Sequence, residues 1–289
     1  MTINKIVVRT ADVPKYLSVF SYIKFRTDID RRFQRLPKPQ NSVHELQLNY
    51  PVRNLMQSAN AAISRYGCYG WLSRQGRSDS SYRSLSLTHN PLINDPNVTE
   101  LNSTLGSSLI DNRSFFYGNF GTWLKLRGRL RDSYYDSYAF NQPNAIIKEF
   151  FSDFHSHFNR TMIRSRLSVI CSGANDSLNP DYLLHKDEPV YENIRVNIPV
   201  TLSPKHYLQY GGYDINMRLG HAYTWDTNQP HRVHGVDNTN RINLVLGFSP
   251  WFDYVPEDRV WVSNEYYGEV HPIEMVRSGL IVDVVQQPR

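Results

Sequence analysis

Apolar residues recur at helical spacing in two segments of the first half of the chain. In residues 51–66 they mark one face of a helix, with Pro51 at a permitted start and Gly67 at a natural stop. A second apolar stripe follows Pro143. Its members are Ile146, Ile147, Phe150, Phe151, Phe154 and Phe158. The pattern therefore predicts one helix over residues 51–66 and another over residues 143–158.

From Met162 onward the pattern changes to short alternating or apolar runs separated by Gly, Asn, Asp and Pro, as expected for strands joined by turns. The predicted strands are residues 162–170, 182–187, 194–200, 215–225, 231–236 and 241–248. One earlier strand is expected from Tyr82 to Leu87 within the loop-rich segment 73–112. This texture predicts a mainly β protein with flanking helices. Its core is expected to be a double-stranded β-helix, the jelly roll of cupins, after an N-terminal extension that contains helix.

Length and composition set the broad class. The chain has 289 residues, of which 40% are hydrophobic, enough for a sizeable core. We expect an N-terminal extension over residues 1–120 and the jelly-roll domain over residues 121–289. The formal net charge is +5 and the basic residues are interspersed with other types, so no nucleic-acid partner is expected. The two cysteines, Cys68 and Cys171, lie far apart in the sequence, which argues against a disulfide framework.

The chain opens with only a short apolar run. No stretch approaches the roughly 18 consecutive apolar residues that a membrane span requires. We therefore expect a cytoplasmic protein without membrane association.

Candidate metal ligands lie in two of the predicted strands. In a strand, His185 and Asp187 would point to the same side and could offer a nitrogen and an oxygen to one metal ion. By itself this pair is weak evidence, since with ten histidines about one His-x-Asp/Glu triplet arises by chance, and a surface pair is the plain alternative. His231 begins a later strand, and His234 competes with it. Two histidines and one carboxylate form the facial triad of non-haem Fe(II) oxygenases.

Arg241 opens the last predicted strand, in which apolar residues 242, 244 and 246 share one face while Arg241 and Asn243 share the other. Turn residues precede it, so a hairpin would lay the strand of His231 beside the strand of Arg241. An arginine inside a barrel needs a carboxylate partner. A bound diacid such as 2-oxoglutarate meets that need with bidentate geometry. Three protein ligands would leave two iron positions for a 2-oxo acid and one for dioxygen, with succinate and carbon dioxide as products.

Further motifs surround these residues in a fixed order. His185 is followed by Arg195-Val196-Asn197-Ile198-Pro199, then by Trp225-Asp226, then by Pro230-His231-Arg232-Val233, with Arg241 ten positions past that histidine. This order, over residues 167–248, resembles the aspartyl/asparaginyl β-hydroxylase family of Fe(II)/2-oxoglutarate oxygenases, which includes bacterial proline hydroxylases.

The resemblance implies His185, Asp187 and His231 as the iron ligands. It implies Arg241 as the anchor of 2-oxoglutarate and Arg195 as an additional co-substrate contact. The chain departs from the family at Asn197, where family members often have histidine.

The predicted function is therefore that of an Fe(II)/2-oxoglutarate-dependent dioxygenase. It would hydroxylate an amino acid or a peptidyl side chain of the Asp, Asn or Pro type, with 2-oxoglutarate and O2 as co-substrates. Two alternatives stay open. A cupin-type metal protein of another chemistry would bind metal without depending on Arg241. A non-catalytic binding or structural jelly roll would show only a modest stability effect on Asp187→Ala.

Overall fold

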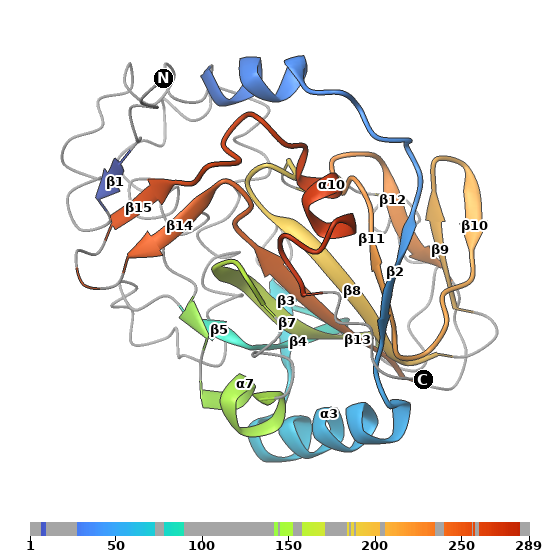
Figure 1. The fold of residues 1–289 in the computed structure, drawn as a ribbon. Helices are drawn as coiled ribbons and strands as arrows, with labels where there is room; N and C mark the ends of the chain where they lie inside the picture. The colour runs from blue at the N-terminus through green and yellow to red at the C-terminus, as the bar shows by residue number, and fades with distance from the viewer. Residues whose placement is uncertain are drawn as a thin grey trace.

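The computed structural model describes residues 7–9, 28–72, 78–89, 142–143, 145–152, 158–170, 184, 186–187, 189–202, 206–234, 240–255, 257 and 260–283. Within them, every strand pairing is antiparallel, and a few helices flank the sheets (Figure 1). The predicted class, mainly β with flanking helices, is confirmed.

A seven-stranded sheet forms the centre of the molecule. Its strands, in spatial order, are β2 (His44–Asn49), β11 (His221–Thr224), β8 (Ile194–Thr201), β13 (Arg241–Phe248), β7 (Met162–Ile170), β4 (Ser78–Ser86) and β3 (Tyr69–Leu72). The central strands β8 and β13 are buried almost along their whole length, because both of their faces are covered. One face carries aliphatic residues of the main core, such as Ile198 and Leu244, which are both fully buried.

A smaller sheet contains β10 (Tyr213–Ile215), β9 (Tyr207–Tyr210) and β12 (His231–His234). The chain runs from β8 in the large sheet to β9 and β10 in the small one, returns to β11, crosses to β12 and returns to β13. This alternation between two antiparallel sheets is that of a jelly roll, here open rather than closed into a barrel. Gly211 and Gly212, with φ of 59° and 85°, make the β9–β10 hairpin turn, because two successive positive φ angles favour glycine.

The remaining elements surround these two sheets. They include the three-stranded sheet of β1 (Val7–Arg9), β15 (Val260–Ser263) and β14 (Phe252–Val255), the strand pair β5 (Thr88–His89) and β6 (Gln142–Pro143), and the helices α3 (Val52–Tyr66), α7 (Ala145–Phe150) and α10 (Pro272–Arg277). Residues 28–35 are also helical. Helices α3 and α7 lie against each other at one end of the large sheet (Figure 1). No helix in the described part of the chain is long and apolar enough to cross a membrane.

The first predicted helix is confirmed and the second is wrong in extent. Helix α3 ends before Gly67, whose φ is 79°. Helix α7 is six residues long, Pro143 belongs to β6, and Phe158 forms an isolated bridge with Val282. The described members of the apolar stripe still pack on the main core, and Phe158 lies edge-on against Phe248 at 4.9 Å between ring centroids. Residues 153–157 lie outside the described ranges.

Most predicted strands are present. β7, β8, β12 and β13 begin where expected, and β4 contains most of the strand predicted from Tyr82 to Leu87. The strand predicted over residues 215–225 is wrong in extent, since only Ile215 belongs to β10 and residues 221–224 form β11, after a turn at Gly220 with φ of 75°. In residues 182–187, the described members Leu184, Lys186 and Asp187 are not in a strand, so that prediction is wrong for them.

Strands from both halves of the chain share the large sheet. β2, β3 and β4 come from residues 1–120, and β7, β8, β11 and β13 come from residues 121–289. The division of the chain at residue 121 stays a prediction.

Acidification is expected to destabilise the fold through His271. The Nδ1 atom of this buried N-cap of α10 accepts a hydrogen bond from the backbone N–H of Ile273 at 3.2 Å. Burial lowers the pKa of His271 to about 4, against the opposing effect of the Asp226 and Glu274 carboxylates. Between pH 6.5 and 4 the unfolded chain therefore binds the proton first, so the free energy of unfolding falls as the pH falls.

The variant His271→Asn retains a capping oxygen but has no titrating ring. Urea unfolding measures the free energy of unfolding at pH 7 and at pH 4. Between these two pH values, this free energy is expected to fall by on the order of 2 kcal/mol more in the wild type than in the variant. Equal losses in the two proteins would contradict the assignment.

Candidate active site

The second face of the large sheet carries polar side chains where the first carries the core. Asn243 on β13 lies opposite Pro199 on β8 and Ser168 on β7, and Val245 lies opposite Asn197 and Arg166. Directly opposed residues point to the same side of a sheet. The buried polar side chains that β7, β8 and β13 place on this face are therefore Arg166, Ser168, Arg195, Asn197, Arg241 and Asn243, each no more than 6% exposed. We call these six residues the polar face.

Asp187 lies against this face. Its Oδ2 atom accepts a hydrogen bond from Nη1 of Arg195, and its side chain is 20% exposed. Its backbone N–H donates to the carbonyl oxygen of Thr227 at 2.9 Å. A buried guanidinium and a backbone hydrogen bond thus hold this carboxylate, although the segment around it is irregular.

His231 approaches the same carboxylate from the small sheet. Its Nε2 atom lies 3.4 Å from Oδ2 of Asp187, and its side chain is 6% exposed. Its Nδ1 atom lies 2.9 Å from the carbonyl oxygen of Gln229. Because a carbonyl only accepts, Nδ1 carries a ring proton, and Nε2 is the nitrogen that faces Asp187. Trp225 packs edge-on against the imidazole, with 6.0 Å between ring centroids.

This pair fits two ligands of one metal ion. Two protein ligands at about 2.1 Å from an ion, in adjacent positions, lie about 3 Å apart. The separation of 3.4 Å between His231 Nε2 and Asp187 Oδ2 is close to that value. A hydrogen bond from the second ring nitrogen to a backbone carbonyl is also the usual support of a metal-binding histidine.

The third predicted ligand, His185, lies outside the described residues, as does the side chain of the competing His234. Among the residues that are described, no three or more His, Cys, Asp or Glu side chains form a metal-binding group. The ligand set of His185, Asp187 and His231 therefore stays a prediction.

The hairpin expected to join His231 and Arg241 is wrong. β12 pairs with β9 in the small sheet, whereas β13 pairs with β7 and β8 in the large sheet. The chain therefore passes from the small sheet to the large one between β12 and β13. Arg241 nevertheless lies on the polar face, at 4% exposure, and on the same side of β13 as Asn243. Its predicted role as co-substrate anchor stays a prediction.

Arg195 donates a hydrogen bond to the Asp187 carboxylate. A contact with the co-substrate stays a prediction.

Loss of Arg195 is expected to destabilise the protein. Arg195→Leu removes the guanidinium that contacts the mostly buried Asp187 carboxylate, and breaking such a pair costs about 3 kcal/mol. Arg195→Lys keeps the positive charge, so its free energy of unfolding is expected to fall less than that of Arg195→Leu. The control Arg277→Leu removes an exposed pair with Glu274 and is expected to change stability by at most about 0.5 kcal/mol. Urea unfolding at pH 7 measures all three. A loss in Arg195→Leu as small as that in the control would contradict the structural role.

Sequence reasoning missed how the polar face is assembled. The amide of Asn243 donates through Nδ2 to Oδ1 of Asn197 at 3.0 Å, and Arg166 lies on the same face. The available signal was the recurrence of polar residues at alternate positions of otherwise apolar strands, as in Arg195-Val196-Asn197.

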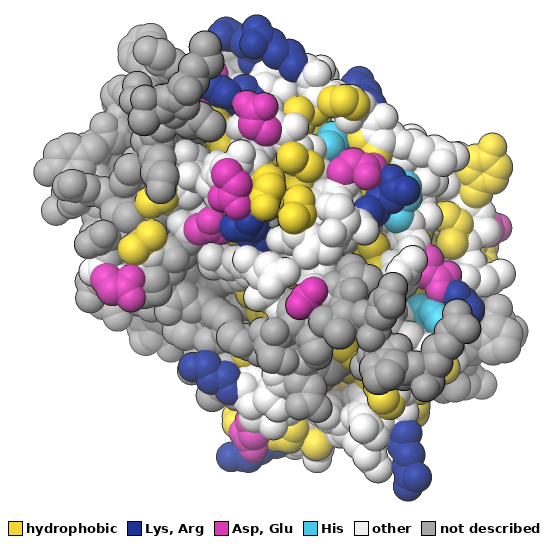
Figure 2. Space-filling view, in the orientation of Figure 1, with side chains coloured by type: hydrophobic (Ala, Val, Ile, Leu, Met, Phe, Trp, Pro, Cys, Tyr) yellow, Lys and Arg dark blue, Asp and Glu magenta, His cyan; other side chains and the backbone are white. Residues whose placement is uncertain are grey.

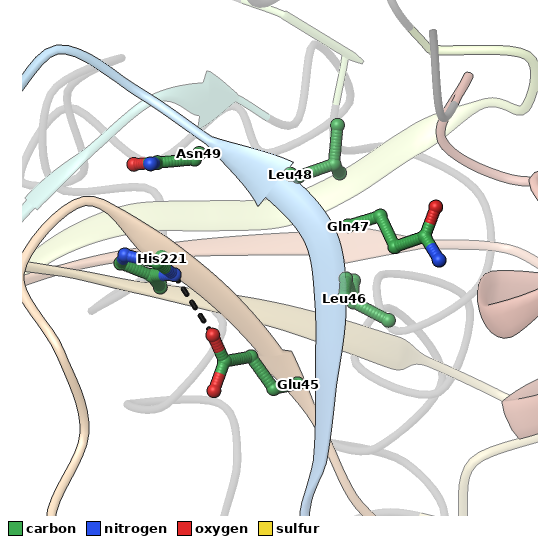
Figure 3. Close-up of a pocket in the computed structure, with 6 residues that line it drawn as sticks. All are labelled: Glu45, Leu46, Gln47, Leu48, Asn49 and His221. Atoms are coloured by element: carbon green, nitrogen blue, oxygen red, sulfur yellow. Dashed lines mark hydrogen bonds and ion pairs between the residues drawn. The ribbon is translucent and has the colours of Figure 1, made fainter. Parts of the chain in front are cut away.

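A groove on the surface runs along the edge strand β2 and is separate from this site. It is lined by Glu45, Leu46, Gln47, Leu48, Asn49 and His221 (Figure 3). His221 Nδ1 lies 2.8 Å from Oε1 of Glu45, so this histidine has a carboxylate partner within the groove. None of the predicted site residues lines it. On the face of the molecule shown in Figure 2, basic and acidic side chains of the described residues are interspersed. The absence of a nucleic-acid partner stays a prediction.

No family model and no curated protein matches the chain. Among solved structures it is similar to a Pseudomonas putida prolyl-4-hydroxylase (9% identity, TM-score 0.34, covering 72% of this chain and 93% of that one). It is also similar to a 2OG-Fe(II) oxygenase family oxidoreductase from Burkholderia pseudomallei (13% identity, TM-score 0.28, covering 86% of this chain and 85% of that one). A third similar structure is that of NgTET1 in complex with 5mC DNA (11% identity, TM-score 0.26, covering 68% of this chain and 90% of that one). At these TM-scores the likeness assigns neither family nor function, and the resemblance to aspartyl/asparaginyl β-hydroxylases stays a prediction.

Proposed function

We propose that the protein is an Fe(II)/2-oxoglutarate-dependent dioxygenase that hydroxylates an amino acid or a peptidyl side chain of the Asp, Asn or Pro type. One observation carries the proposal. His231 Nε2 and Asp187 Oδ2 converge to 3.4 Å beside a sheet face that carries the buried arginines Arg166, Arg195 and Arg241. A nitrogen and an oxygen ligand next to buried positive charge suit a metal ion with an anionic co-substrate.

The chain would hold iron through residues whose orientation is already fixed. The Gln229 carbonyl keeps the proton of His231 on Nδ1 and leaves Nε2 for the metal. Arg195 and the backbone contact with Thr227 hold the Asp187 carboxylate in place. His185 is the proposed third ligand. When bound, iron and 2-oxoglutarate supply the oxidative chemistry that converts O2 and a C–H bond into a hydroxyl group, with succinate and carbon dioxide as co-products.

The polar face would bind the co-substrate through its charge. Arg166, Arg195 and Arg241 are all buried, and a buried guanidinium is stabilised by hydrogen-bonded anions. Arg241 is the proposed anchor for the carboxylate of 2-oxoglutarate that lies away from the metal, because a guanidinium can donate two parallel hydrogen bonds to it. An apolar cluster restricts water near His231. Its buried members are Leu208, Tyr210, Met217, Tyr223 and Trp225.

Anaerobic titration of the purified protein tests this proposal. Fe(II) is added first and 2-oxoglutarate second, while the weak visible charge-transfer band of the chelate is followed. We expect saturation near one equivalent of each and, after O2 is admitted, succinate formation. Stoichiometric iron without the band would point to a cupin-type protein of another chemistry. No iron binding would leave a non-catalytic jelly roll and overturn the proposal.

A further inference from the structure

Two asparagine side chains on the polar face form an incomplete amide pair. Asn197 and Asn243 are 5% and 4% exposed, and one hydrogen bond of 3.0 Å joins Asn243 Nδ2 to Asn197 Oδ1. Two primary amides can form two reciprocal hydrogen bonds, but here the second is not made. The Nδ2 atom of Asn197 and the Oδ1 atom of Asn243 have no hydrogen-bond partner within the described structure. The pair therefore leaves one donor and one acceptor open.

This conclusion does not depend on how the two amides are oriented. If both amide groups were turned over, Asn197 would donate to Asn243, and the open atoms would be Asn197 Oδ1 and Asn243 Nδ2. Either way, one donor and one acceptor remain. A buried polar atom without a partner is destabilising, and a bound group that pairs with it would remove that cost.

The open atoms lie where a substrate could meet the site. Asn197 is two residues from Arg195 on one face of β8, and Asn243 is two residues from Arg241 on one face of β13, so each lies about 7 Å along its strand from an arginine of the polar face. The buried indole Nε1 of Trp225, which contacts His231, is a third polar atom without a partner among the described residues. Three unsatisfied polar atoms thus belong to residues around the proposed metal ligands.

The two co-substrates cannot satisfy this set. Ionised 2-oxoglutarate and O2 have acceptors only, so they could meet the open donor but not the open acceptor. A group with a donor and an acceptor side by side can meet both. A primary carboxamide presents its N–H and C=O on one edge, and an extended peptide residue presents its own N–H and C=O on one side.

We propose that Asn197 and Asn243 bind an amide group of the substrate, so that the enzyme recognises an amide-bearing substrate rather than a plain amino acid. This inference rests on the proposed function. The amide is either a side-chain carboxamide or the backbone of a peptide. Both sources share the same donor–acceptor edge, and suitable probes separate them.

Calorimetric titration with three probes tests the inference. The protein is kept anaerobic, loaded with Fe(II) and saturated with 2-oxoglutarate. The probes are L-asparagine for the carboxamide, N-acetyl-L-aspartate N-methylamide for the peptide backbone, and L-aspartate as the probe without an amide. At least one amide probe is expected to bind about tenfold or more tightly than L-aspartate. Equal binding of all three probes, or none, would overturn the inference.

Two variants locate the binding in the amide pair. In the orientation of the structure, Asn197→Asp keeps the acceptor of the internal hydrogen bond but replaces the open donor with an oxygen. It is expected to weaken the amide probe about tenfold or more. Asn243→Leu removes the open acceptor without adding charge and is expected to weaken the probe similarly. The control Asn60→Asp makes the same change as Asn197→Asp on an exposed position of α3 and is expected to have no effect.

The visible band of the same samples separates the two hypotheses. A wild-type protein that forms the iron–2-oxoglutarate band but binds every probe alike retains the proposed function and overturns the amide inference. A wild-type protein that forms no band overturns both. Variants that lose stability while keeping full affinity for the amide probe would show that the pair is only structural, and would overturn the inference as well.

Discussion

His231→Ala is expected to abolish stoichiometric iron binding and all iron-dependent turnover. The side chain offers Nε2 to the proposed metal position, 3.4 Å from Asp187 Oδ2, and alanine has no atom that can replace it. A facial triad that loses one of its three protein ligands keeps too few donors to hold Fe(II) against water. Calorimetry with Fe(II) under anaerobic conditions, or with Mn(II) as a stable substitute, measures the loss directly. Asp187→Ala is expected to act in the same direction.

A matched histidine variant separates this effect from general damage. His221 lies in the groove beside β2 and has Glu45 as its partner, at 2.8 Å from Nδ1 to Oε1. His221→Ala is therefore expected to leave the iron affinity unchanged. Wild-type iron affinity in His231→Ala would remove His231 from the site. Loss of affinity in both variants would show that the effect comes from destabilisation.

The faces of the β13 residues could be predicted from the sequence, because a strand has a period of two. Arg241 and Asn243 alternate with Ile242 and Leu244, and the register against β7 and β8 confirms that the two sets point to opposite faces. The same local logic found α3, in which apolar spacing, Pro51 and Gly67 agree. These features depend only on residues close in sequence.

The partner of a strand could not be predicted in the same way. The turn residues that follow β12 indicate that the chain reverses direction, but they do not determine which sheet the next strand joins. In the structure β13 returns to the large sheet, so Arg241 reaches the polar face through its pairing with β7 and not through a hairpin. The i, i+2 rule for His185 and Asp187 also requires a strand, and Asp187 lies outside one.

Contacts between distant residues were equally hidden. Asn197 and Asn243 are 46 residues apart, and only the register of β8 against β13 brings their amides together. Arg195 could be recognised as a polar residue in an apolar strand, but its contact with Asp187 depends on an irregular segment that no periodicity describes. The residue types of the candidate site were therefore readable from the sequence, whereas their partners were not.

Arg241→Ala is expected to weaken 2-oxoglutarate binding by about 100-fold or more while the affinity for Fe(II) alone stays unchanged. Truncating one member of a buried charge pair costs about 2–5 kcal/mol, and each 1.4 kcal/mol corresponds to tenfold in affinity. Arg241→Lys keeps the charge but loses the planar fork that matches a carboxylate, so it is expected to recover only part of the affinity. Anaerobic titration of the iron-loaded variants with 2-oxoglutarate measures both dissociation constants.

Arg232 provides the control for this experiment. It lies on β12, where its Nε atom donates to Oε1 of Gln209 at 2.7 Å, and it is not part of the polar face. Arg232→Ala is therefore expected to bind 2-oxoglutarate as the wild type does. If Arg241→Ala also bound it normally, the anchor would have to be Arg166 or Arg195, the other two buried arginines on the polar face. If all three alanine variants bound 2-oxoglutarate normally, binding of the co-substrate through the charge of this face would be ruled out.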